Sequence, residues 1–109
     1  MANTFKLKTK ANVGVTTVGI YTAPASTTTV VIGITLSNTS GSGVNVGVGI
    51  TRAGTTEDVK LLKNAPIPQG SSLEFMAGNK VVLETNDQIN VDSDTNNSGD
   101  AALTIMEIT

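Results

Sequence analysis

Large apolar side chains alternate with small or polar ones along most of this chain, and this period of two constrains its fold more than any other feature. In the clearest run, every second residue is a large aliphatic one: Val30, Ile32, Ile34 and Leu36. Residues 44–50 repeat the pattern, with valine or isoleucine alternating with Asn45, Gly47 and Gly49. Such alternation is typical of β-strands with one buried face, and helical spacing is nowhere sustained. Because Gly47 and Gly49 have no side chain, we expect another backbone or a large side chain to approach this strand closely.

Clusters of Gly, Pro, Asn and Ser divide the chain into eight or nine short strands. Further strands are expected near residues 5–9, 13–21, 58–63, 72–76, 80–84, 88–92 and 101–108, with turns at 52–56, 77–79 and 85–87. The polar turn at 38–43 predicts that the runs 30–36 and 44–50 form a hairpin. Two prolines predict an irregular loop between sheets at 64–70. We therefore expect an all-β, two-layer antiparallel β-sandwich, of either jelly-roll or immunoglobulin-like topology.

The length of 109 residues suits one hydrophobic core, so we expect a single domain over residues 1–109 with a short N-terminal arm over about residues 1–10. Hydrophobic residues make up 39% of the chain and charged residues only 15%, so Thr, Ser, Asn and Gly must form much of the surface. A surface with few charges is compatible with close subunit packing, and burial in an oligomer would add stability.

The composition disfavours several classes of function. A net charge of −2 without a basic cluster argues against nucleic-acid binding. The absence of His and Cys removes the usual metal ligands and the usual activators of a nucleophile, and the carboxylates fall mostly in turns or alternate outward. No apolar stretch reaches the length of a membrane span, and Met1–Lys6 lacks the apolar core of a signal peptide, so we expect synthesis in the cytoplasm. We predict no catalytic residue, no cofactor and no membrane association.

One stretch has the spacing of a metal-binding loop. Asp92, Asp94 and Asn96 match the first three oxygen ligands of a calcium loop. The match then fails, because Asn97 stands where glycine is needed and Leu103 where a bidentate glutamate is needed. We interpret residues 93–100 as an exposed, mobile polar loop built on Asx-turns and assign no metal site, with calcium as the alternative.

Several motifs, taken in order over roughly residues 13–109, resemble small virion structural proteins of tailed phages, above all those of cyanophages and other marine phages. The motifs are GIYTAPA at 19–25, TVVIGI at 29–34 with SNT at 37–39, LKNAPIPQGSSLE at 62–74, ETNDQI at 84–89 and the closing IMEIT at 105–109. The resemblance implies a non-enzymatic β-sandwich that serves as a decoration or cement protein on a capsid. It also implies a virion location after synthesis in the bacterial host.

Such a protein would bridge subunits of the major capsid protein or neighbouring virion subunits, most naturally as a homotrimer at threefold positions. The alternatives are a tail, baseplate or fibre-attachment subunit and, ranked below these, a host-surface carbohydrate-binding module. The fold alone does not separate these roles.

Two strands supply the candidate interface. The candidate residues are Phe5, Lys6, Leu7, Lys8, Lys10, Leu103 and Ile105. In the N-terminal segment 2–10 the three lysines alternate with the apolar residues, so we expect the lysines to meet acidic patches while the apolar residues anchor against a neighbour. An ordinary edge strand is the alternative for this segment. The C-terminal strand is the second candidate, because a free edge there could pair with another chain.

Overall fold

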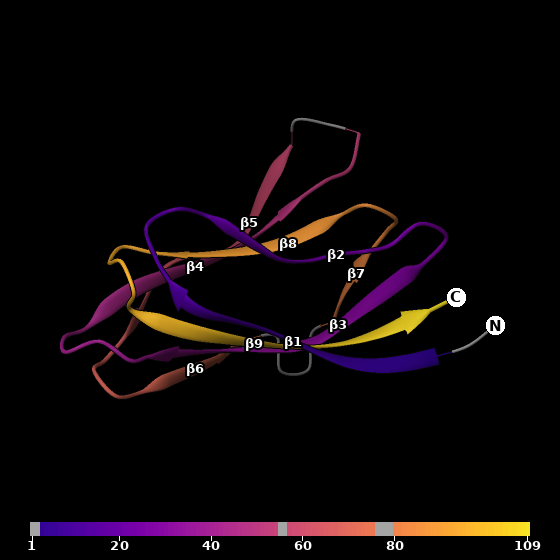
Figure 1. The fold of residues 1–109 in the computed structure, drawn as a ribbon. Coiled ribbons are helices and arrows are strands. Elements are labelled where there is room, and N and C mark those ends of the chain that lie inside the picture. Colours follow the sequence, from indigo (N-terminus) through magenta and orange to yellow (C-terminus); the bar gives the residue numbers. More distant parts are fainter. Residues whose placement is uncertain (1–2, 55–56, 76–79) are drawn as a thin grey trace.

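The computed structural model describes residues 3–54, 57–75 and 80–109, which form two antiparallel β-sheets packed face to face (Figure 1). Sheet A contains β1 (Asn3–Val13), β9 (Gly99–Ile108), β3 (Thr28–Asn38), β6 (Ser72–Phe75) and β7 (Val81–Leu83). Sheet B contains β2 (Val18–Thr22), β8 (Gln88–Ser93), β4 (Val44–Thr51) and β5 (Asp58–Ile67). These nine strands, with no helix in the described ranges, confirm the predicted β-sandwich. No helix that could cross a membrane occurs in these ranges either.

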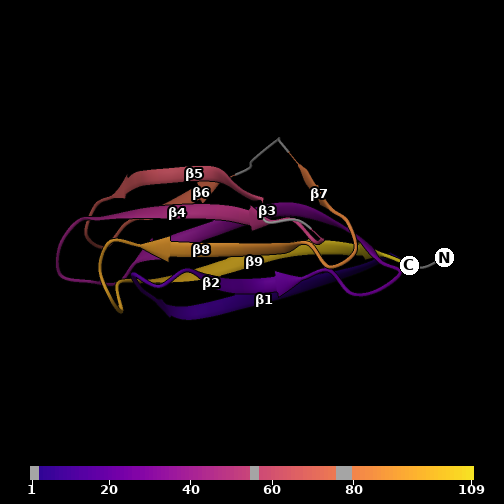
Figure 2. The same ribbon diagram turned by 90° about the horizontal axis from the view of Figure 1, so that it is seen from above.

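The strand order defines a jelly roll. Sheet A runs β1-β9-β3, with both β6 and β7 beside β3, and sheet B runs β2-β8-β4-β5 (Figure 2). Only β4 and β5 are neighbours both in sequence and in a sheet, so nearly every other connection crosses between the sheets. This alternation of sheets is typical of the jelly roll, whereas an immunoglobulin-like fold of seven strands pairs consecutive strands three times within its sheets.

The hairpin predicted from residues 30–36 and 44–50 is wrong. These residues form β3 and β4, which lie in different sheets, and the turn between them crosses the sandwich. The side-chain amide of Asn38 fastens this crossing by donating hydrogen bonds to the carbonyl oxygens of Ser42 (2.8 Å) and Ile67 (2.9 Å). A local turn signal is the same for a hairpin and for a crossing, so strand order cannot be read from it.

The predicted irregular loop at 64–70 begins later than expected. Strand β5 continues to Ile67, and Pro66 is paired in register with Asn45. Proline is tolerated there because β5 is an edge strand, so one side of its backbone has no ladder partner. Met76, Thr55, Thr56 and the expected turn at 77–79 lie outside the described residues.

Aliphatic side chains from both sheets fill the space between the layers. The largest fully buried ones are Ile34, Ile67, Leu83, Ile89, Leu103, Ile105, Val31, Val48 and Val91. In β3 a register shift between Val31 and Gly33 breaks the alternation expected from the sequence. The extra residue of such a bulge changes which side chains face inward. Val30 and Ile32 therefore lie on the outside, contrary to the prediction that they share the core face with Ile34.

Candidate interaction surface

The three lysines of β1 lie on the inner face of sheet A, contrary to the expectation that they point to a partner. In register, Lys6, Lys8 and Lys10 stand opposite buried residues of β9. Strand β1 is the edge of sheet A and is longer than β2 in the facing sheet. Long lysine side chains at such an edge can keep their ammonium groups near water. Inward-pointing charges on an edge strand also discourage unwanted pairing with another strand.

Leu103 and Ile105, the candidates of the C-terminal strand, are core residues. Both are 0% exposed. Strand β9 lies between β1 and β3 and therefore has no free edge for a second chain. The prediction that these two residues contact a partner is wrong, because the strand that carries them is central.

A polar cluster closes the sandwich beside the lysine row. The Tyr21 hydroxyl lies 2.6 Å from Glu107 Oε2, to which it donates a hydrogen bond, and 2.8 Å from Thr29 Oγ1. Lys6 Nζ lies 2.8 Å from Glu107 Oε1, and Lys8 Nζ lies 5.9 Å from the centre of the Tyr21 ring. Lys6 and the Tyr21 hydroxyl hold the pKa of Glu107 below its ordinary value although the side chain is buried. Burial, together with the hydrogen bond to Glu107, raises the pKa of Tyr21 to about 12.

Alkaline titration of Tyr21 tests this cluster, because the chain contains one tyrosine and no tryptophan. We expect the phenol absorbance of the native protein to titrate near pH 12 and that of the urea-unfolded chain near about pH 10. The pKa of Tyr21 is higher in the folded than in the unfolded chain. The protonated Tyr21 hydroxyl therefore contributes to the free energy of unfolding fully below about pH 10, and this contribution is lost as the pH rises towards 12. The Glu107→Gln variant should lower the native midpoint, and a native midpoint near 10 in the unaltered protein would contradict the arrangement.

The outer face of sheet A carries an unbroken apolar row across four strands. In register, Phe5 on β1 stands opposite Met106 on β9, Met106 opposite Val30 on β3, and Val30 opposite Val82 on β7. The exposed fractions at the two ends of the row are 69% for Phe5 and 56% for Val82. The neighbouring Leu7 is 65% exposed. We call this outer surface of sheet A the apolar face.

Charge is nearly absent from the apolar face. Among the described strand residues only Glu74 and Asp100 place a charged side chain there, and both lie away from the apolar row. They pair in register with Thr35 and Ser37 at the opposite end of β3. The alternation in the sequence indicates Phe5 and Leu7 as interface residues but does not indicate the rest of this face. The available signal was the continuous apolar run at 30–32, because a strand that is apolar at successive positions cannot bury them all on one side.

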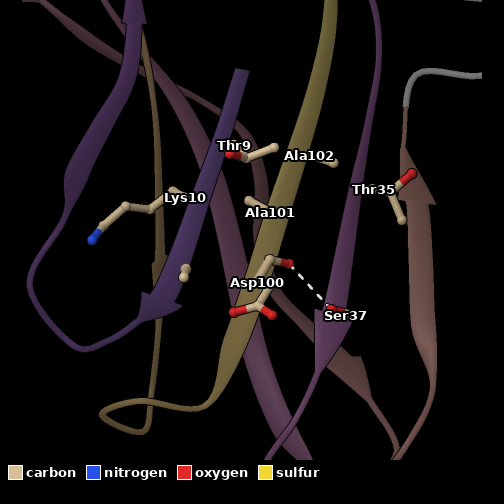
Figure 3. A pocket seen from close by; sticks show the side chains of 8 residues that line it. Thr9, Lys10, Thr35, Ser37, Asp100, Ala101 and Ala102 are labelled. Atoms are coloured by element: carbon tan, nitrogen blue, oxygen red, sulfur yellow. Dashed lines mark hydrogen bonds between the residues drawn. The ribbon is translucent and has the colours of Figure 1, made fainter. Parts of the chain in front are cut away.

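Two shallow grooves lie at the end of the apolar face that is opposite to the apolar row. Their volumes are about 280 and 310 Å³. The first is lined by Thr9, Lys10, Ala11, Thr35, Ser37, Asp100, Ala101 and Ala102 (Figure 3). The second is lined by Ile32, Gly33, Ile34, Thr35, Glu74, Phe75, Ala102 and Thr104. Figure 3 shows Thr9, Ala102 and Thr35 on three neighbouring strands, where their short side chains leave the surface low.

The outer face of sheet B is polar and internally bonded. A Cβ added at Gly47 would lie 2.5 Å from Asp92 Oδ1, and one at Gly49 would lie 3.0 Å from Asn90 Oδ1. The expectation that these glycines admit a close neighbour is thus confirmed. Asp92 Oδ2 accepts a hydrogen bond from Thr17 Oγ1 (3.1 Å) and forms an ion pair with Lys60, whose Nζ lies 3.5 Å away. A face whose polar groups bond to one another and to water has little to gain from a partner.

The stretch with calcium-loop spacing is held by protein hydrogen bonds. Asp94 Oδ1 accepts a hydrogen bond from the backbone amide of Asn45 (3.1 Å), and Asn96 Oδ1 accepts one from that of Val15 (3.1 Å). The predicted loop 93–100 is not exposed throughout, because Ser93 and Ser98 are buried with their hydroxyl oxygens 2.7 Å apart. Within the described residues, no group of three or more His, Cys, Asp or Glu side chains could hold a metal ion.

The fold places this chain among jelly-roll β-sandwich proteins. The sequence matches no protein-family model and no curated protein. Among solved structures, the chain is similar to a subunit of Bacillus endospore appendages, described as a novel family of disulfide-linked pili. That similarity has a TM-score of 0.53 and 17% identity over 96% of this chain and 85% of the other.

Two viral structures are also similar. A protein of infectious bursal disease virus, Gx strain, gives a TM-score of 0.55 and 11% identity over 98% of this chain. The match covers 33% of that protein, so this chain corresponds to about a third of its length. A chain of the cyanophage Pam1 capsid asymmetric unit gives a TM-score of 0.40 and 12% identity over 96% of this chain and 84% of the other. The appendage subunit and the bursal disease virus protein share the fold of this chain.

Proposed function

We propose that this protein is a non-enzymatic structural subunit of a phage virion, specifically a capsid decoration protein that bridges and stabilises subunits of the major capsid protein. The observation that carries the proposal is the contrast between the two outer faces of the sandwich. The apolar face exposes Phe5, Leu7 and Val82, whereas the outer face of sheet B is polar. A subunit built into a particle needs one surface for its neighbours and another that stays in water.

The proposal also draws on the sequence and on the similar structures. The chain resembles small virion proteins of tailed phages, and it shares its fold with a subunit of an assembled appendage and with part of a viral protein. Because only 15% of the residues are charged, few charged side chains must lose their hydration water when this protein packs against a neighbour. In this role the lysines of β1, whose side chains face inward and reach water around the edge of sheet A, would meet acidic groups on the capsid at that edge.

A carbohydrate-binding role has less support. Glycan sites commonly use the exposed ring of an aromatic residue with a polar group as a platform, and the chain contains one tyrosine, Tyr21, and no tryptophan. Tyr21 is buried and bonded to Glu107 and Thr29 instead. A tail, baseplate or fibre-attachment subunit remains the competing structural role, because it would use the same apolar face.

Quantitative mass spectrometry of purified virions tests the proposal. For a decoration protein we expect an abundance near that of the major capsid protein, unchanged in heads from which the tails have been removed. The major capsid protein in the same samples provides the internal reference. Low abundance that disappears with the tails would favour the tail-accessory role, and absence from the virion would overturn both.

A further inference from the structure

We propose that the apolar face binds a second copy of this chain, turned end for end, in a two-fold symmetric dimer. The inference rests on the proposed function only in taking the apolar face as an assembly surface, and it names the neighbour that covers that face. The arguments are the size of the face, its relief and the position of its charges.

The apolar face is large enough for a stable contact between two copies. Four strands lie abreast, β1, β9, β3 and then β6 or β7, and the longest have 11 residues. With strands about 4.8 Å apart and a rise of about 3.3 Å per residue, the described strands of this face cover roughly 600 Å². A standard protein interface buries about 800 Å² on each partner. One face laid against one face therefore falls in the range of a specific interface.

The shape of the apolar face is self-complementary. One end carries the protruding row that begins at Phe5 and ends at Val82, and the other end carries the two grooves beside Ala102. A two-fold axis that lies in the interface and runs across the strands reverses each strand and keeps the strand order. The rotation places the protruding end of each copy over the grooved end of the other, so both contacts form twice.

The axis passes through the middle row of the face. That row consists of Leu7 on β1, Thr104 on β9 and Gly33 on β3, which are register neighbours. Each of these residues would face its own copy across the axis. Thr104 is exposed and lies on the central strand of the row, so its side chain is the most direct probe of this geometry.

The charges agree with the end-for-end arrangement. Glu74 and Asp100 lie at one end of the face, so the rotation places them at opposite ends of the dimer, away from their copies. The same rotation leaves both β1 strands, and hence both lysine rows, along one side of the dimer. A parallel arrangement would instead bring the four acidic groups together, and like charges that meet in an interface are costly.

A homotrimer, favoured at the sequence level, requires contact between two different surfaces of the chain. Outside the apolar face, the large hydrophobic residues described as exposed are Val15 and Val59. They lie in the loop before β2 and on β5, in separate parts of the chain. Neither forms a patch that could receive the apolar face of a neighbour, so the face fits a copy of itself.

Analytical ultracentrifugation over a range of concentrations tests the dimer. We expect the unaltered protein to sediment as a dimer and the Thr104→Glu variant to sediment as a monomer, with a dissociation constant raised at least about 100-fold, because two carboxylates would meet at the axis. The Thr104→Lys variant should also be a monomer, and mixing the two variants should restore a dimer. Thr22→Glu, which adds the same charge at an exposed position of sheet B, is the matched control and should stay dimeric.

Outcomes of this experiment separate the dimer from the proposed function. A monomeric or trimeric unaltered protein, a dimer insensitive to Thr104→Glu, or variants that stay monomeric when mixed would each overturn the end-for-end dimer. None of these outcomes changes the copy number in virions, which tests the proposed function by itself. Circular dichroism of both glutamate variants should match that of the unaltered protein, since both positions are exposed.

Discussion

Replacing Leu103 with Ala will lower the free energy of unfolding by about 3 kcal/mol, as is usual when a fully buried leucine is truncated in a core that relaxes only partly. Leu103 is 0% exposed and lies in β9, which is paired on both sides with β1 and β3. The substitution removes apolar contacts between the sheets and leaves a cavity. Urea unfolding followed by circular dichroism measures the loss as a lower midpoint at unchanged slope.

The adjacent position supplies the control for this prediction. Thr104 points from the same strand to the outer face, so Thr104→Ala should change the free energy of unfolding by less than about 0.5 kcal/mol. Equal costs at Leu103 and Thr104 would contradict the assignment of faces in β9. The pair therefore tests whether Leu103 is a core residue, as the structure has it, or an interface residue, as the sequence suggested.

The alternation in the sequence predicts strands and their number because it is a local property. Which strands become neighbours depends on contacts between distant segments, and no turn motif encodes them. The hairpin predicted from β3 and β4 failed for this reason. The jelly-roll order followed only from the pairing of β3 with β9 and of β4 with β8.

The interaction surface was predictable only in part, because alternation shows which residues share a face but not which face is buried. On β1 the sequence correctly grouped Phe5 with Leu7 and separated them from Lys6, but the lysines turned out to be on the inner side. An edge strand allows this inversion because long side chains reach water around the rim. On β3 the bulge after Val31 placed Ile32 outside, and a bulge of this kind has no sequence signal that the alternation reveals.

The second large effect is expected at Asp87, a buried carboxylate that joins two loops. Its Oδ1 accepts a hydrogen bond from the backbone amide of Ala53 (2.9 Å), and its Oδ2 accepts one from that of Glu84 (3.0 Å). Arg52 Nε lies 3.2 Å from Asp87 Oδ2. The Asp87→Ala variant deprives both amides of their acceptor, and we expect it to lower the free energy of unfolding by about 3 kcal/mol at neutral pH. Urea unfolding measures this cost.

The pH dependence of that cost distinguishes an ionised carboxylate from a merely well-packed side chain. Burial by itself raises the pKa of Asp87, but the hydrogen bonds from Ala53 and Glu84 and the charge of Arg52 outweigh it and hold the pKa below its ordinary value of 3.8. A lowered folded pKa contributes stability above the unfolded pKa that is lost as the pH falls through the folded pKa. The difference in the free energy of unfolding between the unaltered protein and Asp87→Asn should therefore be constant at neutral pH and shrink below about pH 4.

Glu84→Gln provides the control for this pH dependence. Its position is exposed and keeps its backbone amide, so this variant should still lose stability in acid as the unaltered protein does. A difference that stays constant down to pH 2 would show that the charge of Asp87 does not stabilise the loops, because the Asp87 carboxyl would then have the same pKa in the folded and the unfolded chain.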